Sequence, residues 1–354
     1  METDPLKAIS QAIESSENAQ QVGMLTIKVA NRALEDASRR PNPDELYHSL
    51  WYEGEVGCLF ADSNLGKSIY AVQIAEYIAA DRPVLYLDCE LSEKQFQLRY
   101  TDKETGLLHE FPPFFFRAEI NPAAIDPKQY EEMILKNIEE AMLQNCCKTA
   151  IIDNIGYLCN STDKGVDAGK FMMNLLQLKR MYGWSLLIIA HTPKRSLSSP
   201  ITQNDLAGSK RLFNYFDSVM AIGQSAKDDR LRYVKQLKIR SGEQEYGGNN
   251  IIVYEISHDG GFVHFQFVEF GNESEHLRDR SDEAREVERN NIAELKNQGK
   301  SVRQIAAVLG ISKSKVDRII KELPPVPSPE GTGQEGQAGQ LGQPGLFDGE
   351  SQEA

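Results

Sequence analysis

One segment near the start of the chain restricts the fold more than any other feature. Residues 56–60 are apolar, and residues 68–80 have the spacing of an amphipathic helix. The loop between them reads Ala61-Asp62-Ser63-Asn64-Leu65-Gly66-Lys67-Ser68. A strand, a loop ending in Gly-Lys-Ser and a helix make a phosphate-binding P-loop, in which backbone N–H groups and the helix dipole hold phosphate oxygens.

This loop predicts an ATP site with Mg²⁺. Lys67 is expected to reach the β- and γ-phosphates, Ser68 is expected to place its hydroxyl on Mg²⁺, and the other loop residues surround the phosphates. Ala61 occupies the position where the motif normally has glycine. Because alanine has a much smaller left-handed region than glycine, the turn there must accommodate a Cβ atom.

Short apolar runs alternate with helix-period stretches between about residues 53 and 270, which predicts an α/β domain whose mainly parallel sheet is flanked by helices. The expected strands are residues 56–60, 84–87, 114–116, 149–152, 185–190 and 218–222. Runs at 231–239 and 251–256 predict a hairpin, and 262–270 an edge strand. Ahead of this domain, residues 5–15 and 24–37 have helical spacing. These two helices are expected to pack on their own subunit or on a neighbouring one.

Carboxylates and a histidine follow three of the expected strands. Asp153 ends an apolar strand, the Walker B pattern, and is expected to hold Mg²⁺ through water. Asp88 and Glu90 share a face if their strand continues, and Glu90 is the preferred base for the attacking water. His191 could hydrogen-bond the γ-phosphate or that water. A helix cap for Asp153, a surface acid for Glu90 and a core or capping role for His191 remain alternatives.

Lys67, Glu90, Asp153 and His191 in this order resemble the RecA-like P-loop ATPases, and more narrowly the hexameric replicative DNA helicases of the RepA and DnaB types. The resemblance covers about residues 51–270. It implies that Glu90 is the general base and that His191 couples the ATP state to DNA-binding loops.

The segment 235–242 is similar to the Lys-x-Arg hairpin that these helicases insert into the ATP site of the neighbouring subunit. The resemblance implies that Arg240, with Lys238 beside it, acts in trans as an arginine finger in a hexameric ring. A guanidinium there stabilises transition-state charge. The alternative is a solvated edge-strand face.

Loops 154–170 and 192–207 would face a central channel, where Lys194 and Arg195 contact single-stranded DNA.

Residues 291–323 predict a second DNA-binding element. Ser301 and Ser312 are placed to cap two helices, with Gly310 at the turn between them. The spacing resembles resolvase-type helix-turn-helix modules, whose final helix enters the major groove. That resemblance makes Lys313, Ser314, Lys315 and Arg318 candidate contacts to duplex DNA. A small helical hairpin used for protein contacts is the alternative.

The chain carries a net charge of −13, which taken alone argues against a nucleic-acid partner. Its distribution reverses that argument, because residues 324–354 hold five acidic residues and no Lys or Arg, whereas residues 300–323 hold six basic and two acidic ones. The tail composition is typical of disorder. Within it, Gln343, Leu346 and Phe347 look like the short peptide that docks on bacterial sliding clamps, although such short motifs arise easily by chance.

The expected organisation is an N-terminal helical segment (1–50), a RecA-like ATPase domain (51–271), a charged linker (272–290), the helix-turn-helix module (291–323) and a disordered acidic tail (324–354). Five cysteines without a CxxC pattern predict neither a disulfide framework nor a zinc site, and favour the cytoplasm. No apolar run approaches the length of a membrane span.

The preferred function is that of an ATP-dependent motor, a RepA-like replicative helicase of a plasmid or mobile element. Two alternatives remain open: a RecA-like recombination or repair ATPase that forms filaments, and an ATP-switched, site-specific DNA-binding initiator or regulator.

Overall fold

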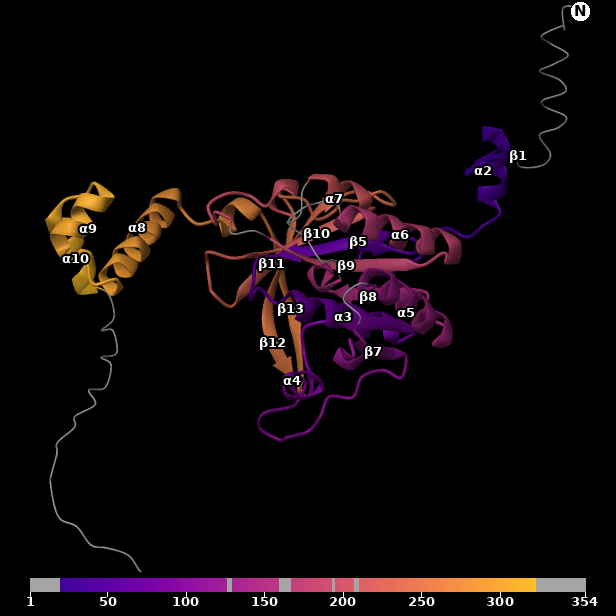
Figure 1. The fold of residues 1–354 in the computed structure, drawn as a ribbon, viewed down its shortest axis with the longest axis horizontal. Coiled ribbons are helices and arrows are strands. Elements are labelled where there is room, and N and C mark those ends of the chain that lie inside the picture. The colour runs from indigo at the N-terminus through magenta and orange to yellow at the C-terminus, as the bar shows by residue number, and fades with distance from the viewer. Residues whose placement is uncertain (1–19, 126–128, 159–166, 193–194, 207–209, 323–354) are drawn as a thin grey trace, which may run out of the picture. The chain divides into compact units, whose positions relative to one another are not determined.

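A nine-stranded sheet organises the first part of the chain in the computed structural model (Figure 1). The structure describes residues 20–125, 129–158, 167–192, 195–206 and 210–322. Contacts divide the chain into two compact units, Met1–Glu283 and Ala284–Ala354.

The strand order in the sheet is β13-β12-β11-β10-β5-β9-β8-β6-β7. The strands from β10 to β7 run parallel, and β11 to β13 extend the sheet in antiparallel fashion. The strands are β5 (Val56–Ala61), β6 (Val84–Asp88), β7 (Phe115–Glu119), β8 (Thr149–Asp153), β9 (Ser185–His191), β10 (Ser218–Gln224), β11 (Leu231–Lys238), β12 (Ile251–Asp259) and β13 (Phe262–Gly271). The predicted mainly parallel α/β fold, with its hairpin and edge strand, is confirmed.

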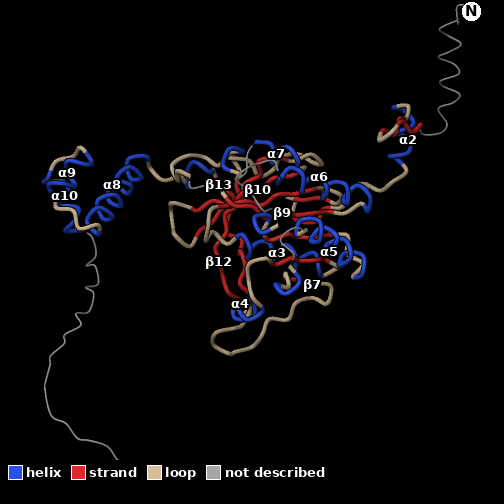
Figure 2. The backbone as a smooth tube through the Cα atoms, viewed as in Figure 1, coloured by secondary structure: helices blue, strands red, loops and turns tan. Residues whose placement is uncertain are grey.

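Helices cover both faces of the parallel strands (Figure 2). On β5, Cys58 and Phe60 pack into the core beneath α5 (Tyr130–Gln144) and α6 (Asp167–Tyr182). Leu59 and Ala61 point to the opposite core, which α3 (Lys67–Ala79) covers. Because both faces are buried, these strands are continuously apolar, as expected for a parallel sheet between helix layers.

The topology brings several strand ends together. The chain leaves β5, forms α3, and enters β6 on the far side of β9 and β8. The carboxyl ends of β5, β6, β8 and β9 therefore lie at one edge of the sheet, the place where open α/β sheets bind ligands. Two short helices, α4 (Glu93–Arg99) and α7 (Lys210–Tyr215), complete this unit.

The N-terminal residues differ from the helices expected there. β1 (Gln20–Val22) and β2 (Leu25–Ile27) form a hairpin, and α2 begins only at Ala30 and ends at Ser38. Gly23, with φ +57°, turns the chain, and the β-branched Thr26 and Ile27 favour a strand. Of the two packing alternatives for residues 24–37, the structure does not show packing on the same subunit, because α2 buries none of its residues. The helix expected over residues 5–15 lies outside the described residues.

Residues just before the expected ATPase domain also belong to its core. β3 (Glu45–Tyr47) pairs with β4 (Trp51–Tyr52), and Leu46, Tyr47 and Leu50 are buried against α3. The helical character expected for residues 1–50 therefore holds only for α2 among the residues described there.

The charged segment expected as a solvated linker from Asn272 is packed at its start. Asn272 caps a 3₁₀ turn, Glu273–His276, in which Glu273 and His276 are buried. Glu273 accepts hydrogen bonds from the Ile201 backbone and from Lys235 on β11. The high charge density of the segment predicted that Glu273 would be exposed. Its partners Ile201 and Lys235 lie far away in the sequence, so the local pattern could not reveal these contacts. The helical end of the segment is confirmed, because α8 spans Arg280–Asn297.

The second unit contains the predicted helix-turn-helix arrangement. α9 (Val302–Leu309) starts with a capping box at Ser301, and Gly310 ends it with φ +66°. α10 spans Lys313–Glu322. The core of this unit consists of Ile292, Ile305, Ala306, Val316 and Ile319. Gln343, Leu346 and Phe347 lie outside the described residues.

Candidate active site

A cavity of about 370 Å³ lies at the carboxyl edge of the sheet. Its lining residues come from the P-loop and the start of α3, from the segment after β6, from the ends of β8 and β9, from α4 and from β12. They are Ser63, Asn64, Gly66, Lys67, Ser68, Ile69, Glu90, Arg99, Asp153, His191 and Ile256. The fold thus brings together the five residues expected to bind Mg·ATP and hydrolyse it: Lys67, Ser68, Glu90, Asp153 and His191.

The P-loop resolves the question raised by Ala61. Ala61 is the last residue of β5, and the left-handed conformations of the loop occur at Asn64 (φ +63°) and Gly66 (φ +89°). A Cβ atom is therefore compatible with the start of this loop. Position 66 requires glycine, because a Cβ atom there would lie 2.9 Å from the Phe265 ring. Ala61 and Leu65 are buried, so they shape the loop and do not line the cavity.

The side chain of Lys67 hydrogen-bonds to the backbone of its own loop. Its Nζ atom donates to the carbonyl oxygens of Ala61 at 2.9 Å and Asp62 at 2.8 Å. Burial lowers the pKa of Lys67, while the nearby carboxylates of Asp153, Glu90 and Asp62 act in the opposite direction. Phosphate oxygens would add negative charge beside this buried ammonium group and so stabilise its protonated form.

Asp153 is suited to hold Mg²⁺ together with Ser68. Its side chain is buried, accepts a hydrogen bond from Tyr86 Oη at 2.7 Å, and also interacts with the Ser68 hydroxyl. Burial raises the pKa of Asp153 to about 6. A bound cation would stabilise the ionised form. Among the described residues, no group of three or more His, Cys, Asp and Glu side chains could hold a metal ion. One carboxylate and one hydroxyl fit an ion that arrives with a nucleotide.

Glu90 and Asp88 have different environments. Asp88 is buried and receives two bonds from Arg117, at 3.0 and 3.1 Å. It also caps the following turn by accepting from the Glu90 and Leu91 backbones. The strand ends at Asp88, so the two acids do not continue on one strand face. Of these two acids, only Glu90 lines the cavity, which supports the choice of Glu90 as the general base.

The pKa of Glu90 is lowered, chiefly by hydrogen bonding to His191, with further contributions from the charges of Lys67 and Arg99. Glu90 Oε1 lies 3.5 Å from His191 Nε2. A carboxylate with a lowered pKa is ionised at neutral pH, as a general base must be.

Two residues of this site were missed by the sequence analysis. Asn154 follows Asp153 and hydrogen-bonds both Glu90 and His191. Arg99 brings a cation to the cavity from the last turn of α4. A Ser-x-x-Gln capping box at Ser92 starts this helix and could have predicted the helix that carries Arg99.

The predicted finger residues lie outside this cavity. Arg240 forms an ion pair with Asp217 at 2.8 Å, and Asp217 also accepts from the backbone of Val56, the first residue of β5. The P-loop follows the other end of β5, and six residues of strand span roughly 20 Å. Lys238 donates to the Phe213 carbonyl at 3.3 Å, and burial lowers its pKa.

The candidate DNA contacts fall in both units. Arg195 donates to the Ser199 carbonyl at 2.8 Å and is partly buried, while Lys194 lies outside the described residues. In the second unit, Lys313, Ser314 and Arg318 are exposed on α10. Lys315 pairs with Glu288 of α8 at 2.7 Å.

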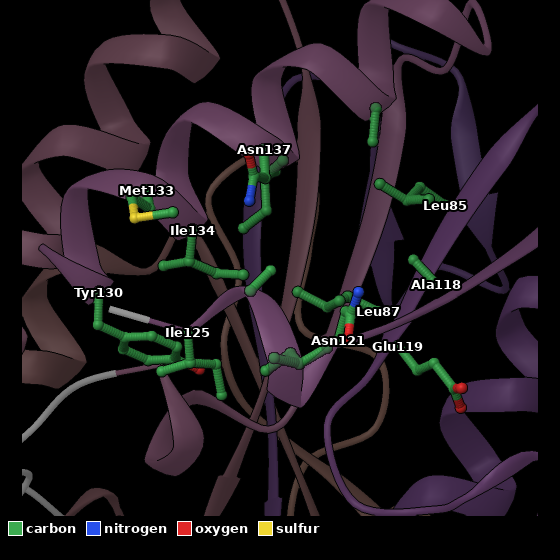
Figure 3. A pocket seen from close by; sticks show the side chains of 14 residues that line it. Leu85, Leu87, Ala118, Glu119, Asn121, Ile125, Tyr130, Met133, Ile134 and Asn137 are labelled. Carbon is green, nitrogen blue, oxygen red and sulfur yellow. The ribbon is translucent and has the colours of Figure 1, made fainter. Parts of the chain in front are cut away.

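A second cavity, of about 240 Å³, lies between β6, β7 and α5 (Figure 3). Leu85, Leu87 and Ile134 form apolar walls, with Tyr130 and Met133 near its rim. Among the described residues that line it, none is a lysine, arginine or histidine. The first cavity, which Lys67 lines, is therefore the better candidate for a phosphate site.

Two known protein families match the chain, one in the first unit and one in the second. Residues 21–196 match the AAA domain family, and residues 286–322 match a helix-turn-helix domain family. No curated protein matches the sequence. The first match includes Lys67, Glu90, Asp153 and His191 and ends before β10. The matched segments place an AAA-type P-loop domain ahead of a helix-turn-helix module, which supports a DNA-associated ATPase. In the described part of the chain, no helix has the length and apolar character of a membrane span.

Proposed function

We propose that this P-loop ATPase is an ATP-driven DNA motor, a replicative helicase of the RepA type carried by a plasmid or mobile element. One observation carries the proposal. Lys67, Glu90, Asp153 and His191 line one cavity, whereas Arg240 is anchored beside the opposite end of β5. If Arg240 serves an ATP site, that site belongs to another subunit, which makes hydrolysis depend on assembly in a ring.

The residues of the cavity support hydrolysis of ATP. Glu90 would take the proton of the attacking water, and Lys67 would stabilise the phosphates. Ser68 and Asp153 would hold Mg²⁺, which neutralises charge on the phosphate oxygens when it is bound. His191 lies next to Glu90, so a change at the γ-phosphate can reach the segment that follows β9. That segment includes Lys194 and Arg195, the proposed contacts to single-stranded DNA in the channel.

The second unit supports a duplex DNA partner. α10 presents Lys313, Ser314 and Arg318 outward while Val316 and Ile319 face the core. A helix with this division fits the major groove. The tail peptide around Leu346 and Phe347 remains a proposed clamp contact.

The test is strand displacement on a forked DNA substrate with ATP and Mg²⁺, combined with particle symmetry from electron microscopy. Closed hexameric rings that displace the strand and hydrolyse ATP faster with single-stranded DNA are expected. Open helical filaments without displacement would instead indicate a recombination or repair ATPase.

The helix-turn-helix module favours a second candidate, an ATP-switched initiator or regulator. That candidate requires ATP-dependent binding to one duplex site without strand displacement. Removing residues 291–354 would then abolish site binding and leave basal hydrolysis in place.

A further inference from the structure

Asn154 occupies the junction between the proposed base and its neighbour. Its side chain is 1% exposed. The Nδ2 atom donates to Glu90 Oε1 and lies 2.9 Å from His191 Nε2. The Oδ1 atom accepts from the Gly156 backbone at 2.9 Å and so caps the 3₁₀ turn Ile155–Tyr157. The amide group of Asn154 therefore contacts Glu90, His191 and the turn after β8 at the same time.

The position of Asn154 in the sheet explains this reach. β8 lies between β6 and β9, so the residue after β8 stands between His191, at the end of β9, and Glu90, in the segment that follows β6. Glu90 and His191 are themselves partly exposed, at 32% and 45% of their side chains. Their relative orientation depends on a buried donor between them.

We infer that Asn154 is a positioning residue that holds Glu90 and His191 as one unit and ties both to the turn after β8. This inference rests on the proposed ATP hydrolysis. Asn154 would not contact the substrate. It would orient the base toward the water and transmit a shift of His191 or Glu90 to residues 155–158.

The sharpest variant is Asn154→Asp, which has nearly the same shape. An aspartate still accepts from the Gly156 backbone and keeps the cap, but it loses both donors and places a second carboxylate beside Glu90. Asn272→Asp is the matched control, because Asn272 caps the 3₁₀ turn Glu273–His276 in the same way, accepting from Ser274 at 3.0 Å.

We expect Asn154→Asp to lower kcat by about 10²–10³-fold, within the range that general-base catalysis contributes. KM for MgATP and the binding of ATPγS should change little, because no phosphate contact is removed. Asn272→Asp should retain the wild-type kcat. Equal kcat values for all three proteins would overturn the inference, as would an equal loss of kcat and ATPγS binding in Asn154→Asp.

Hydrogen exchange of residues 155–158 gives a second readout in the full-length protein. The exchange rate should differ between the ADP and ATPγS states of the wild type, and this difference should vanish in Asn154→Asp. A difference that persists would contradict the tie to the turn. If the unaltered protein hydrolyses no ATP, the proposed function and this inference both fail. If it hydrolyses ATP and Asn154→Asp is unaffected, only the inference fails.

Discussion

Arg240 Nη1 lies 2.8 Å from Asp217 Oδ1. The other carboxylate oxygen of Asp217 accepts from Lys179 Nζ at 3.1 Å and from the Val56 backbone at 2.9 Å. Arg240 is therefore anchored at the amino end of β5, whereas the P-loop follows the carboxyl end. The side chain of Arg240 is nevertheless 57% exposed, so a partner at the surface can reach it.

Arg240→Ala should leave ATP binding intact and lower hydrolysis strongly, by up to the roughly 10³–10⁵-fold that arginine fingers contribute in GTPases. Lys67→Ala should abolish hydrolysis by weakening phosphate binding. In the proposed ring the two defects would fall on opposite sides of one interface, so mixing the two inactive proteins should restore part of the ATPase rate. The measurement is phosphate release before and after mixing.

The matched control for Arg240 is Arg230→Ala, since Arg230 is also exposed and pairs with Asp228 and Glu255. It should keep the wild-type ATPase rate. A mixture of Lys67→Ala and Arg240→Ala that stays inactive, although the two proteins assemble together, would exclude action in trans.

The effect of His191 on the pKa of Glu90 allows a prediction of how hydrolysis depends on pH. The pKa of Glu90 is lowered, first by hydrogen bonding to His191, so the base stays ionised until the pH falls below the ordinary glutamate range. His191→Ala removes this cause, and the pKa of Glu90 should rise. The acid limb of the kcat profile, measured with saturating Mg·ATP, should then move to higher pH. An unchanged midpoint would show that Glu90 does not control this limb.

The sequence predicted the strands and the cavity well because both depend on local patterns. Apolar runs buried on both faces mark parallel strands, and residues that follow such strands meet at one edge. Glu90, Asp153 and His191 could be placed in this way. Asn154 could not, because its role depends on the order of β6, β8 and β9 in space.

The errors at the two ends of the ATPase unit have different causes. Leu25 and Leu34 have helical spacing, but the turn at Gly23 and the β-branched residues after it produce a hairpin first. Glu273 sits in a charge-dense segment, yet its partner Lys235 lies on β11. Local spacing and local charge do not reveal contacts made across the sheet.

Arg318 and Lys313 predict the salt dependence of duplex binding. Both are exposed on α10, and a phosphate contact by either should contribute about 0.9 to the slope of log K against log salt. Arg318→Ala should therefore weaken binding and reduce the slope by about one contact if it binds phosphate. Lys296→Ala, on α8, removes the same charge outside α10 and serves as control. Equal slopes for Arg318→Ala, Lys313→Ala and the wild type would remove both residues from the phosphate contacts.

Glu273 predicts a large contribution to the stability of the ATPase unit. Its carboxylate is 4% exposed, pairs with Lys235 Nζ at 2.5 Å and accepts from the Ile201 backbone at 2.7 Å. Glu273→Ala leaves the partly buried Lys235 ammonium and the buried Ile201 N–H group without their carboxylate, and the loss of one partner of a buried ion pair costs about 3–5 kcal/mol. Urea unfolding followed by tryptophan fluorescence measures it, because both tryptophans, Trp51 and Trp184, are buried in this unit. Glu275→Ala, which breaks the exposed pair with Lys227, should change the free energy of unfolding far less. Equal effects of the two substitutions would mean that burial of Glu273 contributes nothing beyond a surface charge.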